Sequence, residues 1–105
     1  MDAFNPADSA LRINVAASGD TALVAAATGK RTRVHALRLS VAGAVIVQIK
    51  DGSTVLETFN FAAAGTMPPL ELRHAPYYVG TTNTALNINL SGAVQVDGRI
   101  EYAVA

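Results

Sequence analysis

The sequence has no cysteine and no tryptophan, and charged residues make up 15% of its 105 positions. Without cysteine the chain has no disulfide framework, no thiolate zinc site and no thiol nucleophile. Eight basic and eight acidic residues cancel to a formal net charge of +0. This balance disfavours nucleic-acid phosphates and an acidic membrane surface as partners. The longest apolar stretches, Ala22–Ala27 and Ala44–Val47, are far shorter than the ~20 residues that span a bilayer.

Half of the residues are hydrophobic, which excludes general disorder, and the length fits one domain. The first residues, MDAFNPADSA, contain neither a basic segment nor an apolar one, so we expect no secretory signal. The protein is then made in the cytoplasm and stays soluble. Turn-forming residues around an isolated Phe4 predict a flexible arm over residues 1–9, followed by a single domain over residues 10–105.

From residue 10 onward, short runs of strand-forming residues alternate with turn signals at the spacing of an all-β sandwich. The predicted strands are 11–15, 21–27, 32–41, 44–50, 53–61, 77–79, 85–91 and 94–104, with at most an edge strand at 67–70. The run 21–27 is also compatible with a short helix because it is rich in alanine, but Gly29 ends it early and favours a strand. The fold class predicted is an antiparallel β-sandwich, jelly-roll-like, with about eight strands.

Two local features of this pattern are specific enough to be tested. In the run 32–41, His35 alternates in phase with Leu37 and Leu39, so we expect the three side chains on one face of a strand. Asp51-Gly52 lies between two strand-like runs and predicts a two-residue type I′ hairpin turn.

Residues that could support catalysis or metal binding are sparse. His35 and His74 are the only histidines, and neither has a second ligand at metal-binding spacing. No serine lies in a Gly-x-Ser-x-Gly nucleophile motif. We therefore expect no enzymatic activity, no catalytic residue, no cofactor and no metal. His35 is interpreted as a histidine of the core or of an interface.

Two small groups of residues are candidates for binding. Lys30, Arg31 and Arg33 form the densest cluster of charge, which could contact an acidic patch on a partner or could be a solvated turn. Tyr77-Tyr78 is the only adjacent aromatic pair. Its rings could form a platform for a sugar, or one ring could lie in the core and the other at an interface.

The predicted outer faces of the strands carry little charge. Asn87, Asn89, Thr58 and Ser40 are typical of them. Free monomers usually protect their edge strands with lysines or other charges. The scarcity of such residues suggests that part of the surface is covered by copies of the same chain or by a partner.

Three segments resemble small virion proteins of tailed bacteriophages. They are Gly29–Val34, the turn Asp51–Thr54 and the run Ala85–Gly98, and the similarity extends from about Asp20 to Tyr102. The nearest family is that of the capsid decoration (cement) proteins. The resemblance implies a jelly-roll fold, a homotrimer and no catalytic residues. It also implies binding to the major capsid protein on the capsid exterior of the virion, after synthesis in the host cytoplasm.

We expect the partner-binding residues to be Phe4 and Pro6 in the arm, together with Lys30, Arg31, Arg33 and Tyr77. The arm could order on the shell as an anchor, or it could remain disordered. The family places an aromatic pair that often includes tryptophan after a proline-bearing loop, whereas this chain has Tyr77-Tyr78 there. The alternative function is a tail or head-fibre component that binds host-surface carbohydrate.

Overall fold

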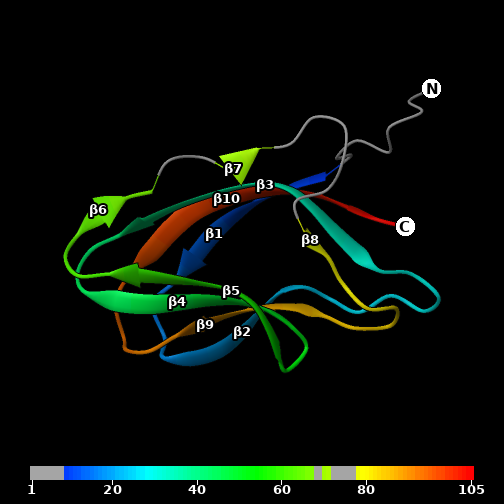
Figure 1. The fold of residues 1–105 in the computed structure, drawn as a ribbon, viewed down its shortest axis with the longest axis horizontal. Helices are drawn as coiled ribbons and strands as arrows, with labels where there is room; N and C mark the ends of the chain where they lie inside the picture. Colours follow the sequence, from blue (N-terminus) through cyan, green and yellow to red (C-terminus); the bar gives the residue numbers. More distant parts are fainter. Residues whose placement is uncertain (1–8, 68–69, 72–77) are drawn as a thin grey trace.

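The structure, a computed structural model, describes residues 9–67, 70–71 and 78–105 (Figure 1). The described residues form strands joined by turns and loops. The strands are β1 (Ser9–Val15), β2 (Gly19–Val24), β3 (Thr32–Val41), β4 (Val45–Asp51), β5 (Thr54–Phe61), β6 (Gly65–Thr66), β7 (Leu70–Glu71), β8 (Tyr78–Val79), β9 (Leu86–Leu90) and β10 (Val96–Val104).

These strands form two antiparallel sheets that lie face to face (Figure 1). Sheet A has the order β1-β10-β3, and the short strands β6, β7 and β8 all pair with the far edge of β3. Sheet B has the order β2-β9-β4-β5. The expected antiparallel β-sandwich is therefore confirmed.

The path of the chain through the two sheets is that of a jelly roll. Strand β1 pairs with β10, β2 with β9, β3 with β6 to β8, and β4 with β5, as in one long hairpin whose apex is the β4–β5 turn. From β1 to β4 the chain passes from one sheet to the other at every step. This rolls the long hairpin into a sandwich and confirms the predicted topology.

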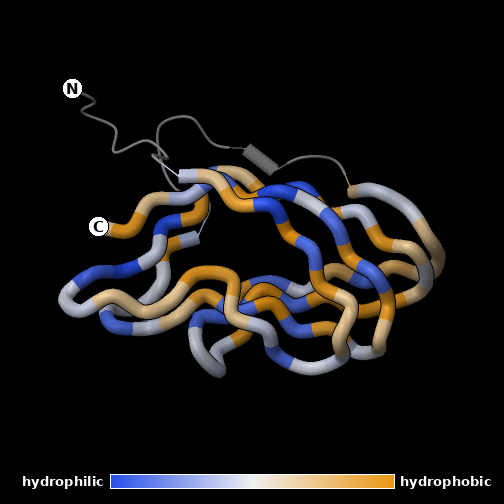
Figure 2. Tube along the Cα trace, turned by 180° about the vertical axis from the view of Figure 1, so that it is seen from behind, coloured by the Kyte–Doolittle hydropathy of each residue, from blue (hydrophilic) through white to orange (hydrophobic). Residues whose placement is uncertain are grey.

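Alternation along the strands builds the core between the sheets. Figure 2 shows hydrophobic and hydrophilic residues alternating along the chain in both layers. Burying each large aliphatic side chain contributes about 1.5–3 kcal/mol, and strands from both sheets supply them. The buried cluster consists of Ile13, Val15, Val24, Val34, Leu37, Leu39, Val41, Val45, Val47, Ile49, Leu86, Ile88, Leu90, Val96 and Ile100.

The β4–β5 hairpin forms as predicted, but its turn is shifted by one residue. Asp51 pairs with Thr54, so the central residues are Gly52 and Ser53 instead of Asp51 and Gly52. Only Gly52 of this pair has a positive φ, of 60°, which is the pattern of a type II′ turn with glycine first. The Asp51 carboxylate accepts hydrogen bonds from the backbone N–H of Thr81, at 2.9 Å, and from its hydroxyl. These bonds hold Asp51 at the end of β4.

Strand β3 contains a bulge that the sequence pattern did not predict. Glu101–Tyr102 of β10 stand opposite Ala36 and Val34, so His35 has no opposite residue. Regular alternation would bury only every second residue of β3. Because of the bulge, Leu37 on one side of His35 and Val34 on the other are both buried. His35 is itself buried, as Leu37 and Leu39 are, so it lies in the interior as expected, but at a bulge instead of in a regular alternation.

Strand β2 is shorter than predicted. The expected strand 21–27 ends at Val24, which pairs with Leu86, the first residue of β9. Beyond Val24 there is no residue of β9 left to pair with, and residues 25–27 belong to the loop that follows. Pairing partners, and not the propensity of the alanine run, determine where this strand ends.

Gly98, in the middle of sheet A, provides a test of this packing. A Cβ atom at this position would overlap the carbonyl oxygen of Arg38 on the neighbouring strand. We expect Gly98→Ala to lower the free energy of unfolding by about 1–3 kcal/mol because the sheet has to move apart. Urea denaturation measures the change. The control is Gly92→Ala, where no atom lies within 4 Å of the added methyl group; equal effects of the two substitutions would contradict the packing described.

Candidate functional site

The outer face of sheet A carries three arginines that stand directly opposite one another. Arg12 on β1 pairs with Arg99 on β10, and Arg99 pairs with Arg38 on β3. Residues opposite each other on antiparallel strands share a face. The three guanidinium groups therefore form one line across the sheet, which we call the arginine row. Like charges in such positions repel each other.

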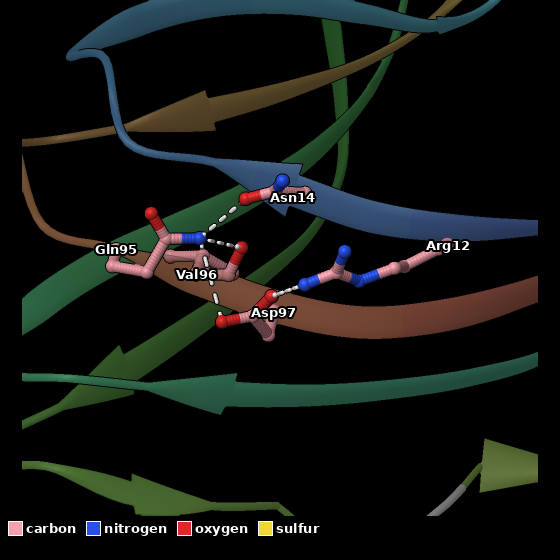
Figure 3. Close-up of polar contacts among 5 residues, drawn as sticks. All are labelled: Arg12, Asn14, Gln95, Val96 and Asp97. Atoms are coloured by element: carbon pink, nitrogen blue, oxygen red, sulfur yellow. Dashed lines mark hydrogen bonds and ion pairs between the residues drawn. The ribbon is translucent and has the colours of Figure 1, made fainter.

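Two residues along each strand, Asn14, Asp97 and Ser40 stand opposite one another, and Asp97 partly neutralises the arginine row. Asp97 accepts a hydrogen bond from Arg12 at 2.9 Å (Figure 3). The side-chain amide of Gln95 bridges β1 and β10. It donates to Asn14 Oδ1 at 2.6 Å and to Asp97 Oδ2 at 3.4 Å. The side chains of Arg12 and Asp97 remain 72% and 43% exposed, so their ion pair contributes at most about 1 kcal/mol.

The other two arginines are less well compensated. Arg99 Nε lies 3.7 Å from Glu101 Oε2, in a pair that is also exposed. Arg38 is exposed and has no ion-pair partner among the described residues. The positive charge of the row is therefore greatest toward β3.

A shallow hollow of about 570 Å³ lies over this part of sheet A. The hydroxyls of Ser40 and Thr66, which are hydrogen-bonded to each other at 3.0 Å, form part of its wall. We call it the arginine hollow. Its lining residues are Arg12, Arg38, Ser40, Thr66, Asp97, Gly98 and Arg99, three cations against one anion.

Sequence reasoning missed this site. Arg12 and Arg38 each lie between inward-facing aliphatic residues, and Arg99 directly precedes the buried Ile100. Their outward direction could therefore have been predicted from the alternation. The alignment of the three arginines could not have been predicted, because it depends on the register of three strands that are far apart in the sequence.

The outer face of sheet B is almost uncharged. Its two charges, Asp20 and Lys50, are paired at 3.1 Å, and Asn89 donates to Asp20 Oδ1 at 2.7 Å. We call this surface the neutral face. By strand register, its other described residues are Ala22, Ile46, Gln48, Val55, Thr58, Asn60 and Asn87.

The hydrogen bond from Asn89 and the ammonium group of Lys50 lower the pKa of Asp20 below its ordinary value of 3.8. Both groups favour the ionised carboxylate. The resulting stabilisation is present above the ordinary pKa and is lost as the pH falls through the lowered pKa of the folded state.

The sheet edges have protective features that the sequence did not reveal. Strands β2 and β5, at the edges of sheet B, each contain a bulge, and one edge of sheet A consists of the two-residue strands β6 to β8. The other edge, β1, has Arg12 at its centre. Bulges, short strands and edge charges all oppose edge-to-edge pairing. The low overall charge therefore does not indicate that the edges are covered.

The three residues of the predicted basic cluster differ in exposure, and their role in binding stays a prediction. Lys30 and Arg31 are exposed in the turn before β3, whereas Arg33 is half-buried within the strand. The backbone of Arg31 exchanges two hydrogen bonds of 3.0 Å with Ala105, and its guanidinium donates to Thr82 Oγ1 at 3.2 Å. Arg31 therefore joins the chain end and a neighbouring loop to the turn.

The remaining candidates are Phe4, Pro6 and Tyr77, which lie outside the described residues. Their predicted role in binding stays a prediction. Tyr78 packs against the core and its hydroxyl donates to Glu57 Oε1 at 2.8 Å. This ring is therefore the core member of the tyrosine pair and is not the exposed platform that sugar binding requires.

The histidines add no metal site within the described part of the chain. His35 is buried, and its Nε2 has no hydrogen-bond partner among the described residues. His74 lies outside them. Residues 9–67, 70–71 and 78–105 contain no group of three or more His, Cys, Asp or Glu side chains placed to hold a metal ion.

Comparison with known proteins assigns no family to the chain. No family model matches it, and searches of curated proteins and of solved structures find no match. None of the described residues belongs to a helix long and apolar enough to cross a membrane.

The pKa of Asp20 tests the arrangement of the neutral face. We expect Asn89→Ala to raise this pKa toward its ordinary value because the shortest hydrogen bond to the carboxylate is lost. The measurement is an NMR titration of the Asp20 carboxyl carbon. Asn87→Ala is the matched control, since the amide of Asn87 donates to the carbonyl of Gly52 instead. An unchanged pKa in Asn89→Ala, or an equal rise in both variants, would contradict the arrangement.

Proposed function

We propose that this chain is a structural protein of a phage virion, a capsid decoration protein. In this role it binds the major capsid protein on the outer surface of the head, as a homotrimer, and stabilises the shell without catalysis or a cofactor. The proposal is supported by the resemblance of three segments to such proteins and by the jelly-roll sandwich that these segments help to build. The neutral face is the observation on which it chiefly depends.

The neutral face has the properties of a surface that becomes buried between proteins. Interface centres contain few charged residues, and on this face Asp20 and Lys50 satisfy each other. Exposed aliphatic side chains accompany the amides and hydroxyls: Ile46 is 39% exposed and Val55 is 45% exposed. Covering this surface would bury no unpaired charge among the described residues, so the electrostatic cost of the contact is limited to the desolvation of the one pair, Asp20 with Lys50.

A decoration protein works by binding the assembled shell better than the separated subunits. Binding energy then stabilises the shell by mass action. A trimer would attach through three equivalent contacts, so each contact can be weak while the whole remains bound. Threefold cyclic symmetry closes such an assembly. The protected edges of both sheets favour a closed oligomer of this kind over an open chain of paired strands.

The first test is attachment to shells. We expect the purified protein to sediment with shells of its phage that lack it, and Thr58→Lys to bind about tenfold more weakly or worse, because it places an unpaired charge in the neutral face. Ser53→Lys, in the exposed β4–β5 turn, adds the same charge elsewhere and serves as the control. Failure of the wild-type protein to bind shells would refute the proposed function.

The second test concerns the arm and the oligomer. Deleting residues 1–8 should weaken attachment to shells while leaving the trimer intact, since the sandwich begins at Ser9. Sedimentation analysis should give about three times the mass of its own chain for each form, the full chain having a mass of 10.9 kDa. Full occupancy of shells by the shortened protein would argue against an anchoring arm, and a stable monomer would argue against the trimer.

A further inference from the structure

The arginine hollow contains more positive charge than the fold requires. Three arginines stand in line across β1, β10 and β3, where each contributes repulsion to its neighbour. All three emerge from the outer face, so none of them fills the core. Within the folded chain, the exposed pair of Arg12 with Asp97 is the only contribution of the row shorter than 3.0 Å among the described residues, and it is worth at most about 1 kcal/mol.

The nearby carboxylates leave part of this charge unmatched. Asp97 is already engaged on both oxygens, by Arg12 and by Gln95. Glu101 lies 3.7 Å from Arg99, beyond hydrogen-bonding distance. Arg38 has no ion pair within the described part of the chain. The lining of the hollow carries three positive charges and one negative charge, an excess of two in a protein whose formal net charge is zero.

The shape and spacing of the site favour carboxylates on an extended chain. Neighbouring strands lie about 4.8 Å apart, so the row spans roughly 10 Å. Alternate side chains of an extended segment project on the same side about 6.6 Å apart, which lets two of them reach the row together. The guanidinium fork of arginine matches the two oxygens of a carboxylate. The hydroxyls of Ser40 and Thr66 offer further polar contacts.

We propose that the arginine hollow binds an acidic, extended segment of a partner protein, with carboxylates placed at Arg38 and Arg99. The carboxylates of Asp97 and Glu101 on the same face, with Glu71 opposite Ala36 at its edge, oppose a long polyanion such as a nucleic acid, whereas a short segment needs to meet only Arg38 and Arg99. That this partner is the capsid rests on the proposed function. In that case sheet A supplies a charge-specific contact and sheet B an uncharged one.

The direct test uses acidic peptide in solution. In NMR titrations at low salt, acetylated tetraglutamate should shift the side-chain Nε–Hε signals of Arg38 and Arg99 in a saturable way, whereas tetraglutamine should not. Arg38→Gln should weaken this binding about tenfold, the effect of losing one charge-assisted hydrogen bond. Ser53→Glu makes the same change in net charge on the other sheet and should weaken binding much less.

Several results would overturn the inference. They are the absence of saturable shifts at these arginines, equal weakening by Arg38→Gln and Ser53→Glu, or comparable binding of inorganic phosphate at the same sites and ionic strength.

Arg38→Gln removes a like charge from the row, so it should remain folded. Urea denaturation checks that the variant is folded. Arg38→Lys keeps the positive charge but loses the bidentate guanidinium group, so it should bind tetraglutamate with intermediate strength.

Shell binding separates this inference from the proposed function. If wild-type protein binds shells and Arg38→Gln binds them equally well, the acidic-segment site is wrong while the decoration role stands. If wild-type protein fails to bind shells but still binds tetraglutamate through Arg38, the decoration role is wrong and the site stands. Weaker shell binding by Arg38→Gln than by Ser53→Glu supports both.

Discussion

The register of β10 between β1 and β3 is the constraint on which the rest of the structure depends. Gly98 stands between Ile13 and Leu39, and the close approach of the strands there leaves no room for a side chain. One residue further along β10, Arg99 stands between the other two arginines. A shift of one residue would turn the buried face of β10 to solvent. The packing of the core therefore also aligns the arginine row.

The two outer faces of the sandwich have opposite character. Sheet A presents the arginine row among acidic neighbours, whereas sheet B presents amides, hydroxyls and aliphatic groups around one ion pair. A single thin sandwich can in this way offer two chemically different contacts at once. The proposed attachment to a shell makes use of both kinds of contact. Charge is scarce in this chain, yet half of its six arginines lie together in the arginine row.

Irregularities in the strands have a structural role here. The bulges in β2 and β5 lie at the two edges of sheet B, where an unbroken strand could pair with another molecule. The bulge at His35 lies in β3, between the residues that pair with β7 and those that pair with β8. There it changes which side chains face the core. Periodicity alone predicts none of these positions, since a bulge interrupts the alternation from which a strand is recognised.

Local side-chain alternation was enough to predict the all-β class, most strand positions, the β4–β5 hairpin and the outward side of Ser40, Thr58, Asn87 and Asn89. Alternation of side chains is a local property, and these features follow from it. Tertiary structure decided the turn residues Gly52 and Ser53, the end of β2, the bulge at His35 and the arginine row. Each of these depends on which residue stands opposite which. That pairing arises between segments as far apart as Arg12 and Arg99, where long-range packing selects one register among several that local patterns allow.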